Sequence, residues 1–381
     1  MAGVQRIAWS LLFAVGSATA ADGLQALVEE SRLEAHGFVS FGWFRTWENN
    51  YLADDSLDGS DEFYEAALNA TIRPLDRLRL GAQLFVRDLG QYENGAVRLD
   101  WAFAEVTIAP ALVLQGGRVK VPVGLYNELQ DIDPARTTIF LPQALYPIRL
   151  RDIQVSVDGG KATGFLNVPG GTNLDYAVYG GTKNIENDSA FATTSGHRLG
   201  TMPTDIDVDW TVGGMVHWHT PIDGLGLRLS YTRTNDLEVV AGNAEQNSDI
   251  EILVVSAEWE LSAVTIATEY IYVGNDAEVS TPFATIAIES NNNAGYLSTI
   301  WHAASWLDAY GAVEYQHFEQ GGVVRDGWIY VAAFNLMPLS NWSLKAEYQF
   351  HDGSIGILAA DNPQGVSSTW QVLAFKTTVD F

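Results

Sequence analysis

Apolar and polar side chains alternate with a period of two along most of the chain after residue 36, which restricts it to folds built from β-strands. In the segment 77–87, leucine, alanine and valine share one face while arginine and glutamine share the other, and segments 225–232 and 342–351 repeat the pattern. A soluble β-sandwich would show the same alternation, because one face of each strand packs on a core while the other meets water. The connections and the strand ends distinguish a sandwich from a closed barrel.

Short turns alternate strictly with longer polar connections along the chain. The short turns are 74–76, 109–111, 169–172, 221–224, 261–263, 303–305 and 338–340. The longer connections are 48–61, 88–96, 121–152, 183–207, 236–248, 274–292, 319–324 and 352–366. The segments between them have about ten to thirteen residues, the length of tilted strands that cross a bilayer. These connections predict an all-β fold, a transmembrane antiparallel up-and-down β-barrel of about 16 strands.

Aromatic residues lie near the predicted strand ends, where girdles at two water–lipid interfaces are expected. The tryptophans in such positions are Trp43, Trp210, Trp218, Trp259, Trp301, Trp306, Trp328 and Trp342. The last segment, 371–381, places Leu373, Phe375, Val379 and Phe381 on one face. It resembles the C-terminal strand of Gram-negative outer-membrane barrels, whose terminal phenylalanine is recognised by the barrel assembly machinery. A closed barrel is also required physically, because an open sheet edge would leave unpaired backbone groups in lipid.

The N-terminus has the features of an export signal. Arg6 precedes an apolar run, 7–15, and Ala18-Thr19-Ala20 is a small-residue cleavage site, so residues 1–20 are predicted to be a signal peptide. Residues 21–35 form a short periplasmic segment, either an amphipathic helix or a frayed tail, and the barrel occupies 36–381. The sequence therefore predicts a protein exported to the outer membrane of a Gram-negative bacterium.

Composition excludes several classes of function. The chain has 47 acidic and 21 basic residues, a formal charge of −26, so nucleic acid is excluded as a partner because its binding needs clustered positive charge. It has no cysteine, which excludes a disulfide scaffold, a thiolate metal site and a cysteine nucleophile. A barrel of sixteen strands leaves an aqueous lumen, whereas one of eight is filled by its own side chains.

The central segment carries a family resemblance. Its residues are 117–128 (GRVKVPVGLYNE), 139–143 (IFLPQ), Arg151-Asp152 and 158–160 (DGG). Over roughly 98–160 they resemble the proteobacterial porin family that is similar to general diffusion and phosphate-selective porins. The resemblance implies a homotrimer, each subunit with a water-filled pore narrowed by a long third external loop, 121–152, folded into the lumen. It does not imply a phosphate site, because Lys120, Lys161 and Lys183 are too dispersed to form a cluster.

Basic residues concentrate in one part of the barrel, opposite acids in the inserted loop. We predict that the pore is lined by the basic residues Arg77, Arg79, Arg87, Arg98, Arg118 and Lys120 and by the loop acids Glu128, Asp131 and Asp133. Opposite charges across a narrow pore create a transverse field, and rings of charged side chains set ion selectivity. In the alternative interpretation, the arginines only solvate the lumen and brace the loop through ion pairs.

Two segments contain candidate metal ligands. Residues 54–65 match the twelve-residue calcium-loop template, with Asp54, Ser56 and Asp58 at positions one, three and five, a turn glycine at six and Glu65 at twelve. The competing interpretation is a solvated acidic loop, and no other cofactor is expected. His217 and His219 share the lumen face of one strand, but without an identifiable third ligand they are expected to be a solvated pair.

The function predicted from these features is passive diffusion of small hydrophilic solutes and ions through an outer-membrane porin, in contact with lipid and lipopolysaccharide. A substrate-selective channel with a transient solute site at the constriction remains an alternative, and a mainly adhesive or structural barrel is a more distant one. An outer-membrane enzyme is not expected, because no G-x-S-x-G motif surrounds a plausible nucleophile.

Overall fold

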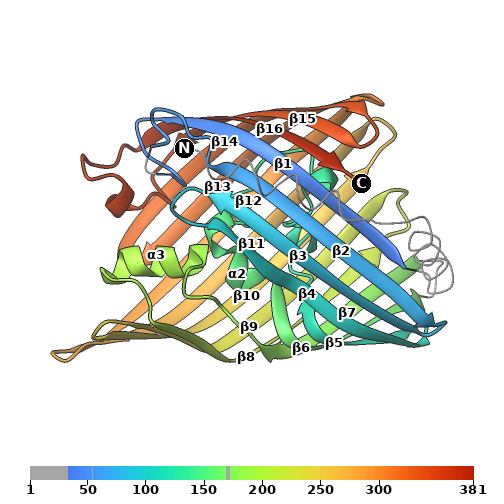
Figure 1. Ribbon diagram of the computed structural model, residues 1–381, viewed down its shortest axis with the longest axis horizontal. Coiled ribbons are helices and arrows are strands. Elements are labelled where there is room, and N and C mark those ends of the chain that lie inside the picture. The colour runs from blue at the N-terminus through green and yellow to red at the C-terminus, as the bar shows by residue number, and fades with distance from the viewer. Residues whose placement is uncertain (1–32, 54, 169–171) are drawn as a thin grey trace, which may run out of the picture.

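The computed structural model describes residues 33–53, 55–168 and 172–381, which form one barrel of sixteen antiparallel strands (Figure 1). Each strand pairs with its neighbours in sequence, and β1 closes the barrel by pairing with β16. The predicted fold class and strand number are therefore confirmed. The predicted signal peptide 1–20, residues 21–32 and Asp54 lie outside the described residues.

The strands are named in chain order. Their bounds are β1 Glu34–Trp47, β2 Phe63–Leu75, β3 Leu78–Leu89, β4 Asn94–Ala109, β5 Leu112–Lys120, β6 Ser156–Val168, β7 Thr172–Thr182, β8 Asp205–His219, β9 Leu225–Ala241, β10 Ala244–Glu260, β11 Val264–Ser280, β12 Thr285–Ala304, β13 Leu307–Gln320, β14 Val323–Leu339, β15 Trp342–Asp352 and β16 Thr369–Asp380. Strand β1 begins at Glu34, two residues before the predicted start of the barrel.

Two of the predicted long loops are strands instead. Residues 236–248 and 274–292 continue the β9–β10 and β11–β12 ladders, which leaves connections of only 242–243 and 281–284. Strands β9 to β11 therefore have 17 residues and β12 has 20, more than the predicted ten to thirteen. Polarity misled the prediction here, because a strand that extends beyond lipid keeps its ladder hydrogen bonds while both of its faces become polar.

The barrel presents an apolar outer face. On β14 the exposed Trp328, Tyr330 and Phe334 alternate with the buried Ile329 and Val331. Seven of the eight tryptophans predicted at strand ends are exposed, namely Trp210, Trp218, Trp259, Trp301, Trp306, Trp328 and Trp342. Such an exposed apolar belt is the surface expected of a barrel that crosses a bilayer. No helix among the described residues is long and apolar enough to span a membrane.

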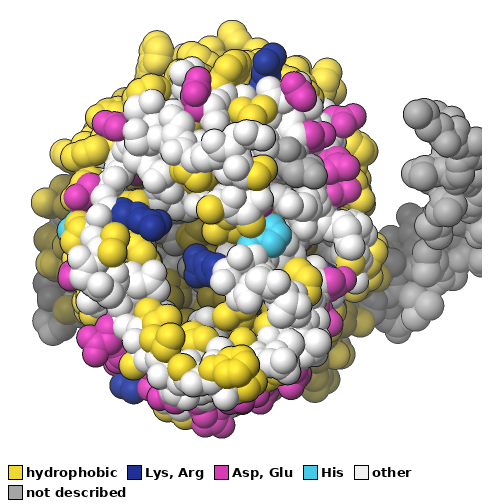
Figure 2. Space-filling model, turned by 90° about the vertical axis from the view of Figure 1, so that its left-hand side faces the viewer, with side chains coloured by type: hydrophobic (Ala, Val, Ile, Leu, Met, Phe, Trp, Pro, Cys, Tyr) yellow, Lys and Arg dark blue, Asp and Glu magenta, His cyan; other side chains and the backbone are white. Residues whose placement is uncertain are grey.

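The two ends of the barrel differ. At the short-turn end, on the right of Figure 1, tight turns join the strands and the C-terminus is found. The long-loop end carries α3 (Ala190–Leu199), whose Ser189 side chain accepts a hydrogen bond from the Ala192 backbone N–H and whose C-cap Gly200 has φ 81°. Figure 2 shows this end as a hollowed face, with acidic side chains around much of the rim and basic and histidine side chains within.

The longest connection, 121–155, joins β5 to β6 and lies within the outline of the barrel (Figure 1). It contains only short helical pieces, which are η2 Asn127–Leu129, η3 Asp133–Ala135, η4 Ile148–Leu150 and α2 Arg151–Gln154. We call residues 121–155 the inserted segment. Helix α3 packs against η4 and α2 of the inserted segment, on the side of the segment that faces the long-loop end of the barrel.

Candidate constriction site

The inserted segment is tied to the wall opposite its own strands by three buried glutamates. Glu347 of β15 accepts hydrogen bonds from the backbone N–H groups of Ile139 at 2.7 Å and Phe140 at 3.2 Å. In the same way, Glu314 of β13 accepts from Ala144 at 3.0 Å. Glu269 of β11 accepts from the Leu125 N–H at 2.8 Å and from the Tyr146 hydroxyl at 2.6 Å. Irregular backbone that is buried must find partners for its N–H groups, and these inward carboxylates provide them.

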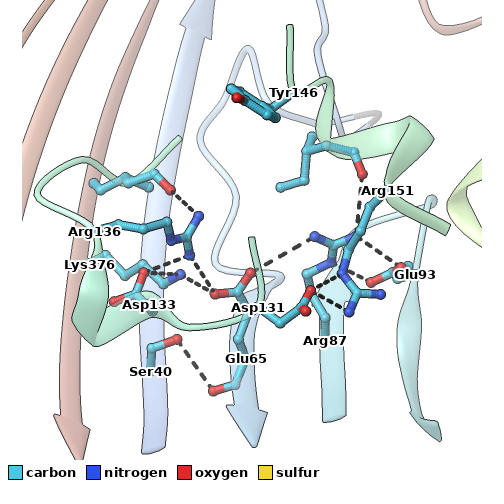
Figure 3. Close-up of polar contacts among 12 residues, drawn as sticks. Ser40, Glu65, Arg87, Glu93, Asp131, Asp133, Arg136, Tyr146, Arg151 and Lys376 are labelled. Atoms are coloured by element: carbon cyan, nitrogen blue, oxygen red, sulfur yellow. Dashed lines mark hydrogen bonds and ion pairs between the residues drawn. The ribbon is translucent and has the colours of Figure 1, made fainter. Parts of the chain in front are cut away.

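Asp133 lies at the centre of one buried ion cluster. Its carboxylate is 2.9 Å from Lys376 Nζ on β16 and from Arg136 Nη2 of the inserted segment (Figure 3). Lys345 Nζ on β15 lies at the same distance. Glu65 on β2 contacts Lys376 and Arg136 and completes the cluster. Two carboxylates thus meet three cations, all buried. The cluster fixes the tip of the inserted segment to strands from both sides of the barrel seam.

Asp131 anchors the segment at a second place. It contacts Arg151 of α2 and lies 2.6 Å from Lys120 Nζ of β5. Arg151 also contacts Asp100 on β4, while the neighbouring Arg87 on β3 is paired with Glu93 (Figure 3). Removal of any one of these buried partners is expected to destabilise the protein, because the remaining charge would be left in a low-dielectric site without solvation.

The two loop acids keep their charge at low pH. Burial alone would raise the pKa of Asp133, but Lys345, Lys376 and Arg136 outweigh it and hold the pKa well below its ordinary value. Burial also acts to raise the pKa of Asp131, and Arg151 with Lys120 reverses that effect and lowers it. A depressed carboxyl pKa contributes stability that is present above the unfolded value, about 3.9, and is lost only as pH falls through the folded value.

We therefore expect the inserted segment to stay anchored on acidification to about pH 4.5, where ordinary carboxylates begin to take up protons. Conductance of the purified barrel in a planar bilayer, compared at neutral pH and at that pH, measures this. An abrupt rise in conductance on acidification would show that the anchors had released.

Two of the three acids predicted to line the pore are buried in ion pairs. Asp131 and Asp133 are 1% and 0% exposed and are neutralised by other cations, so they face no open channel. Glu128 alone of the three acids is substantially accessible, with its side chain 40% exposed and its Oε1 3.2 Å from Lys161 Nζ. Bracing of the loop by ion pairs, the alternative interpretation, is what the geometry supports.

The predicted basic residues occupy separate places. Arg77 is exposed in the turn after β2, and Arg79 makes a bidentate pair with Glu105. Arg98 pairs with Asp188 at 2.8 Å. Arg118 donates to the Ser156 hydroxyl and to the Asn184 carbonyl oxygen. Of the predicted cations only Lys120 contacts the predicted loop acids, through Asp131 and the Glu128 carbonyl oxygen.

The sequence prediction did not place several residues in this site, although it named Glu65 as a calcium ligand and Arg151 within a family motif. They are Glu65, Asp100, Arg136, Arg151, Glu269, Glu314, Lys345, Glu347 and Lys376. A signal was present, because lysines and glutamates occupy positions on strand faces that otherwise hold small or uncharged residues. Such isolated inward charges need a buried partner, and the inserted segment is the element that supplies it.

The calcium-loop hypothesis for residues 54–65 is contradicted at Glu65 and Ser56. Glu65 belongs to β2, and its carboxylate forms ion pairs with Lys376 and Arg136 inside the barrel. The Ser56 hydroxyl is buried and bonds to Thr46 at 2.7 Å. The template fails because the strand begins at Phe63, so position twelve faces the lumen and cannot fold back on the loop.

Much of the inner wall of the barrel is shielded from solvent. Inward-facing side chains on strands spread around the wall are 2% exposed or less, for example Ser40, Gln83, Ser256, Glu314 and Gln349. In a wide water-filled lumen these polar groups would meet solvent. The inserted segment and the loops at the long-loop end cover them instead, so any continuous aqueous path is confined.

Comparison with known proteins identifies the fold. No protein-family model and no curated protein sequence matches the chain. Solved structures do match. A form of OmpT, an outer membrane protein of Vibrio cholerae, lacking loop L8 has a TM-score of 0.58 at 12% identity, over 92% of this chain and 99% of that chain. The chain has the porin fold.

Two further structures support the same conclusion. The anion-selective porin from Comamonas acidovorans has a TM-score of 0.56 at 11% identity, with 92% of this chain and 99% of that chain covered. The outer membrane channel DcaP of Acinetobacter baumannii has a TM-score of 0.57 at 10% identity, with 92% and 97% covered. At such identities the likeness concerns the fold, and the predicted porin architecture is confirmed at that level.

Proposed function

We propose that this protein is an outer-membrane channel through which small hydrophilic solutes and ions diffuse passively. One observation carries the proposal: a closed barrel with an apolar outer belt encloses an interior lined by charged and polar side chains. An interior of that kind favours water and polar solutes over lipid. The structural neighbours described as a porin and an outer membrane channel support the same function.

The burial of the inner wall favours a selective channel as the second candidate. A path confined by the inserted segment brings solutes close to the few charges that remain accessible, among them Glu128, whose side chain is 40% exposed. Close contact with fixed charges permits transient binding and selection of one solute class. Both candidates share the passive mechanism and differ only in the width and chemistry of the constriction.

Planar-bilayer recording of the purified protein tests the proposal. We expect discrete conductance steps with a linear current–voltage relation, and small steps because the interior is largely filled. Blockage of these steps by one class of small hydrophilic solute, and not by others, would assign the selective form. A barrel that inserts fully folded and passes no current would contradict the proposed function.

We also propose that the protein lacks enzymatic activity. The arrangement nearest to a nucleophilic triad is Thr265, His302 and Asp308 at the short-turn end, where His302 Nε2 is 3.1 Å from the threonine hydroxyl and Nδ1 is 2.8 Å from the aspartate. The His302 side chain is 41% exposed, and the His302 backbone N–H is bonded to the Ala263 carbonyl oxygen. A hydrolytic site needs free donors aimed at a developing oxyanion, and this backbone N–H is not free.

Assembly as a homotrimer in the outer membrane, in contact with lipid and lipopolysaccharide, is part of the proposal. One OmpT structure in the comparison is described as a trimer. The C-terminal Phe381 pairs with Gly37 through two backbone hydrogen bonds of 3.0 Å and is 67% exposed. An exposed terminal aromatic ring supports the proposed recognition by the barrel assembly machinery. Cross-linking of the protein in outer-membrane fractions measures the oligomeric state.

A further inference from the structure

Two histidines and one aspartate converge on the inner wall of the barrel at the short-turn end. His217 and His219 lie on β8, and Asp175 lies directly opposite His217 on the neighbouring strand β7. Val216 precedes His217, and Trp218 lies between the two histidines. Both side chains are on the outer face, 41% and 40% exposed, so the alternating histidines point inward. The third member escaped the sequence interpretation because a loop and most of two strands separate Asp175 from the histidines.

We propose that Asp175, His217 and His219 bind one divalent first-row transition-metal ion. One ligand atom from each residue can be chosen so that all three lie within 4.8 Å of one another. His219 Nε2 is 2.7 Å and His217 Nδ1 is 4.0 Å from Asp175 Oδ2. A tetrahedral zinc ion separates its nitrogen and oxygen ligands by about 3.3 Å, a value between these two distances. Small side-chain rotations therefore bring the three groups into ligand geometry.

The chemistry of the three donors selects the ion. Two imidazoles and one carboxylate suit Zn²⁺, Cu²⁺, Ni²⁺ or Co²⁺, whereas Ca²⁺ and Mg²⁺ prefer oxygen donors alone. Three protein ligands leave at least one position open to water or to a passing solute. The side chains of Asp175 and His219 are 38% and 47% exposed, so an ion reaches them from solvent without rearrangement of the barrel.

The wall around His217 is shaped to receive its ring. Gly226 of β9 lies beside the imidazole, and a Cβ atom at that position would come within 2.5 Å of His217 Nε2. The two histidine rings lie against each other with centroids 4.3 Å apart. Arg228 lies on β9 directly opposite His217 in the strand register, and it is the cation that faces the group from that strand. Its guanidinium donates to the Gly124 carbonyl oxygen at 2.7 Å, so Arg228 is bonded to the inserted segment and is not paired with Asp175.

Calorimetric titration of the folded barrel with Zn²⁺ tests the site. The protein should carry no histidine tag and should be treated with a chelator beforehand, because a tag would bind the same ion. We expect saturable binding of one ion per chain. His217→Ala, His219→Ala and Asp175→Asn are each expected to weaken binding at least tenfold, since each removes one of three ligands. Cobalt provides a second readout, through the visible absorption that nitrogen and oxygen ligation produces.

The chain offers a matched control. His302 and Asp308 form a histidine–aspartate pair of 2.8 Å at the same end of the barrel, but with a threonine in place of the second histidine. His302→Ala should leave zinc binding unchanged. A flat titration of the unsubstituted protein would overturn the proposal. Binding that survives unchanged in all three ligand variants would overturn it as well, since the ion would then lie elsewhere.

One consequence rests on the proposed channel function. With neutral histidines the empty group has the single negative charge of Asp175, and a divalent ion changes the local charge from −1 to +1. We expect zinc to shift the reversal potential of the open channel towards anions, and His219→Ala to abolish that shift. Calorimetry does not depend on conduction, so a silent barrel that binds zinc would contradict the channel and leave the metal site supported.

Discussion

Replacing residues 128–145 with a short glycine–serine linker is expected to raise single-channel conductance severalfold. The replaced residues include Asp131, Asp133 and the backbone donors to Glu314 and Glu347, so these four contacts disappear, while those of Leu125 and Tyr146 with Glu269 remain. The two ends of the excision lie within the length of one tyrosine side chain, because the Tyr126 backbone N–H donates to the Tyr146 hydroxyl at 3.2 Å. A short linker therefore joins them without strain on β5 or β6, and the charged wall groups become solvated in the widened lumen.

The control for this experiment is an excision that leaves the interior intact. Residues 279–286 form the tip of the β11–β12 hairpin, and the ladder beneath them continues through Glu278 and Ala287. Replacing this tip with a two-residue turn is expected to leave conductance unchanged. If the shortened inserted segment gave a folded barrel with the conductance of the unsubstituted protein, the segment would not be the constriction of the channel.

The strand pattern was predictable because a barrel wall obeys two local rules. Side chains alternate between lipid and interior, and short turns alternate with longer connections, so sequence alone specifies strand number. The prediction failed where these rules carry no information. In 274–292 polar residues occupy both faces of β11 and β12 beyond the apolar belt, and polarity alone does not distinguish such an extension from a loop.

The sequence identified the connection that contacts the inner wall, but not the wall residues that it contacts. Position along the chain identified 121–152 as the inserted connection, but nothing local indicates which wall its charges reach. Asp133 meets Lys345 and Lys376, more than 200 residues away along the chain. Contacts across a closed barrel depend on strand tilt and on the path of the segment, and both arise only when the whole sheet closes. The metal group shows the same limit, because Asp175 joins His217 only through strand register.

Asp133→Asn is expected to destabilise the barrel by about 3–5 kcal/mol, the cost of removing one member of a buried ion cluster. The cluster contains two carboxylates and three cations, so the substitution raises its net charge from +1 to +2 with no water available. We expect the tip of the inserted segment to leave the wall and conductance to become noisy. Urea unfolding followed by tryptophan fluorescence measures the free energy, and bilayer recording measures the noise.

Two companion variants show whether the cluster itself is responsible. Asp188→Asn removes the partner of Arg98 in a pair whose aspartate is 59% exposed, where a loss of about 0–1 kcal/mol is expected. Adding Lys345→Met to Asp133→Asn removes one of the stranded cations, so the double variant is expected to be more stable than the single one. If Asp133→Asn cost no more than Asp188→Asn, or if Lys345→Met gave no recovery, the buried cluster would not be what holds the inserted segment.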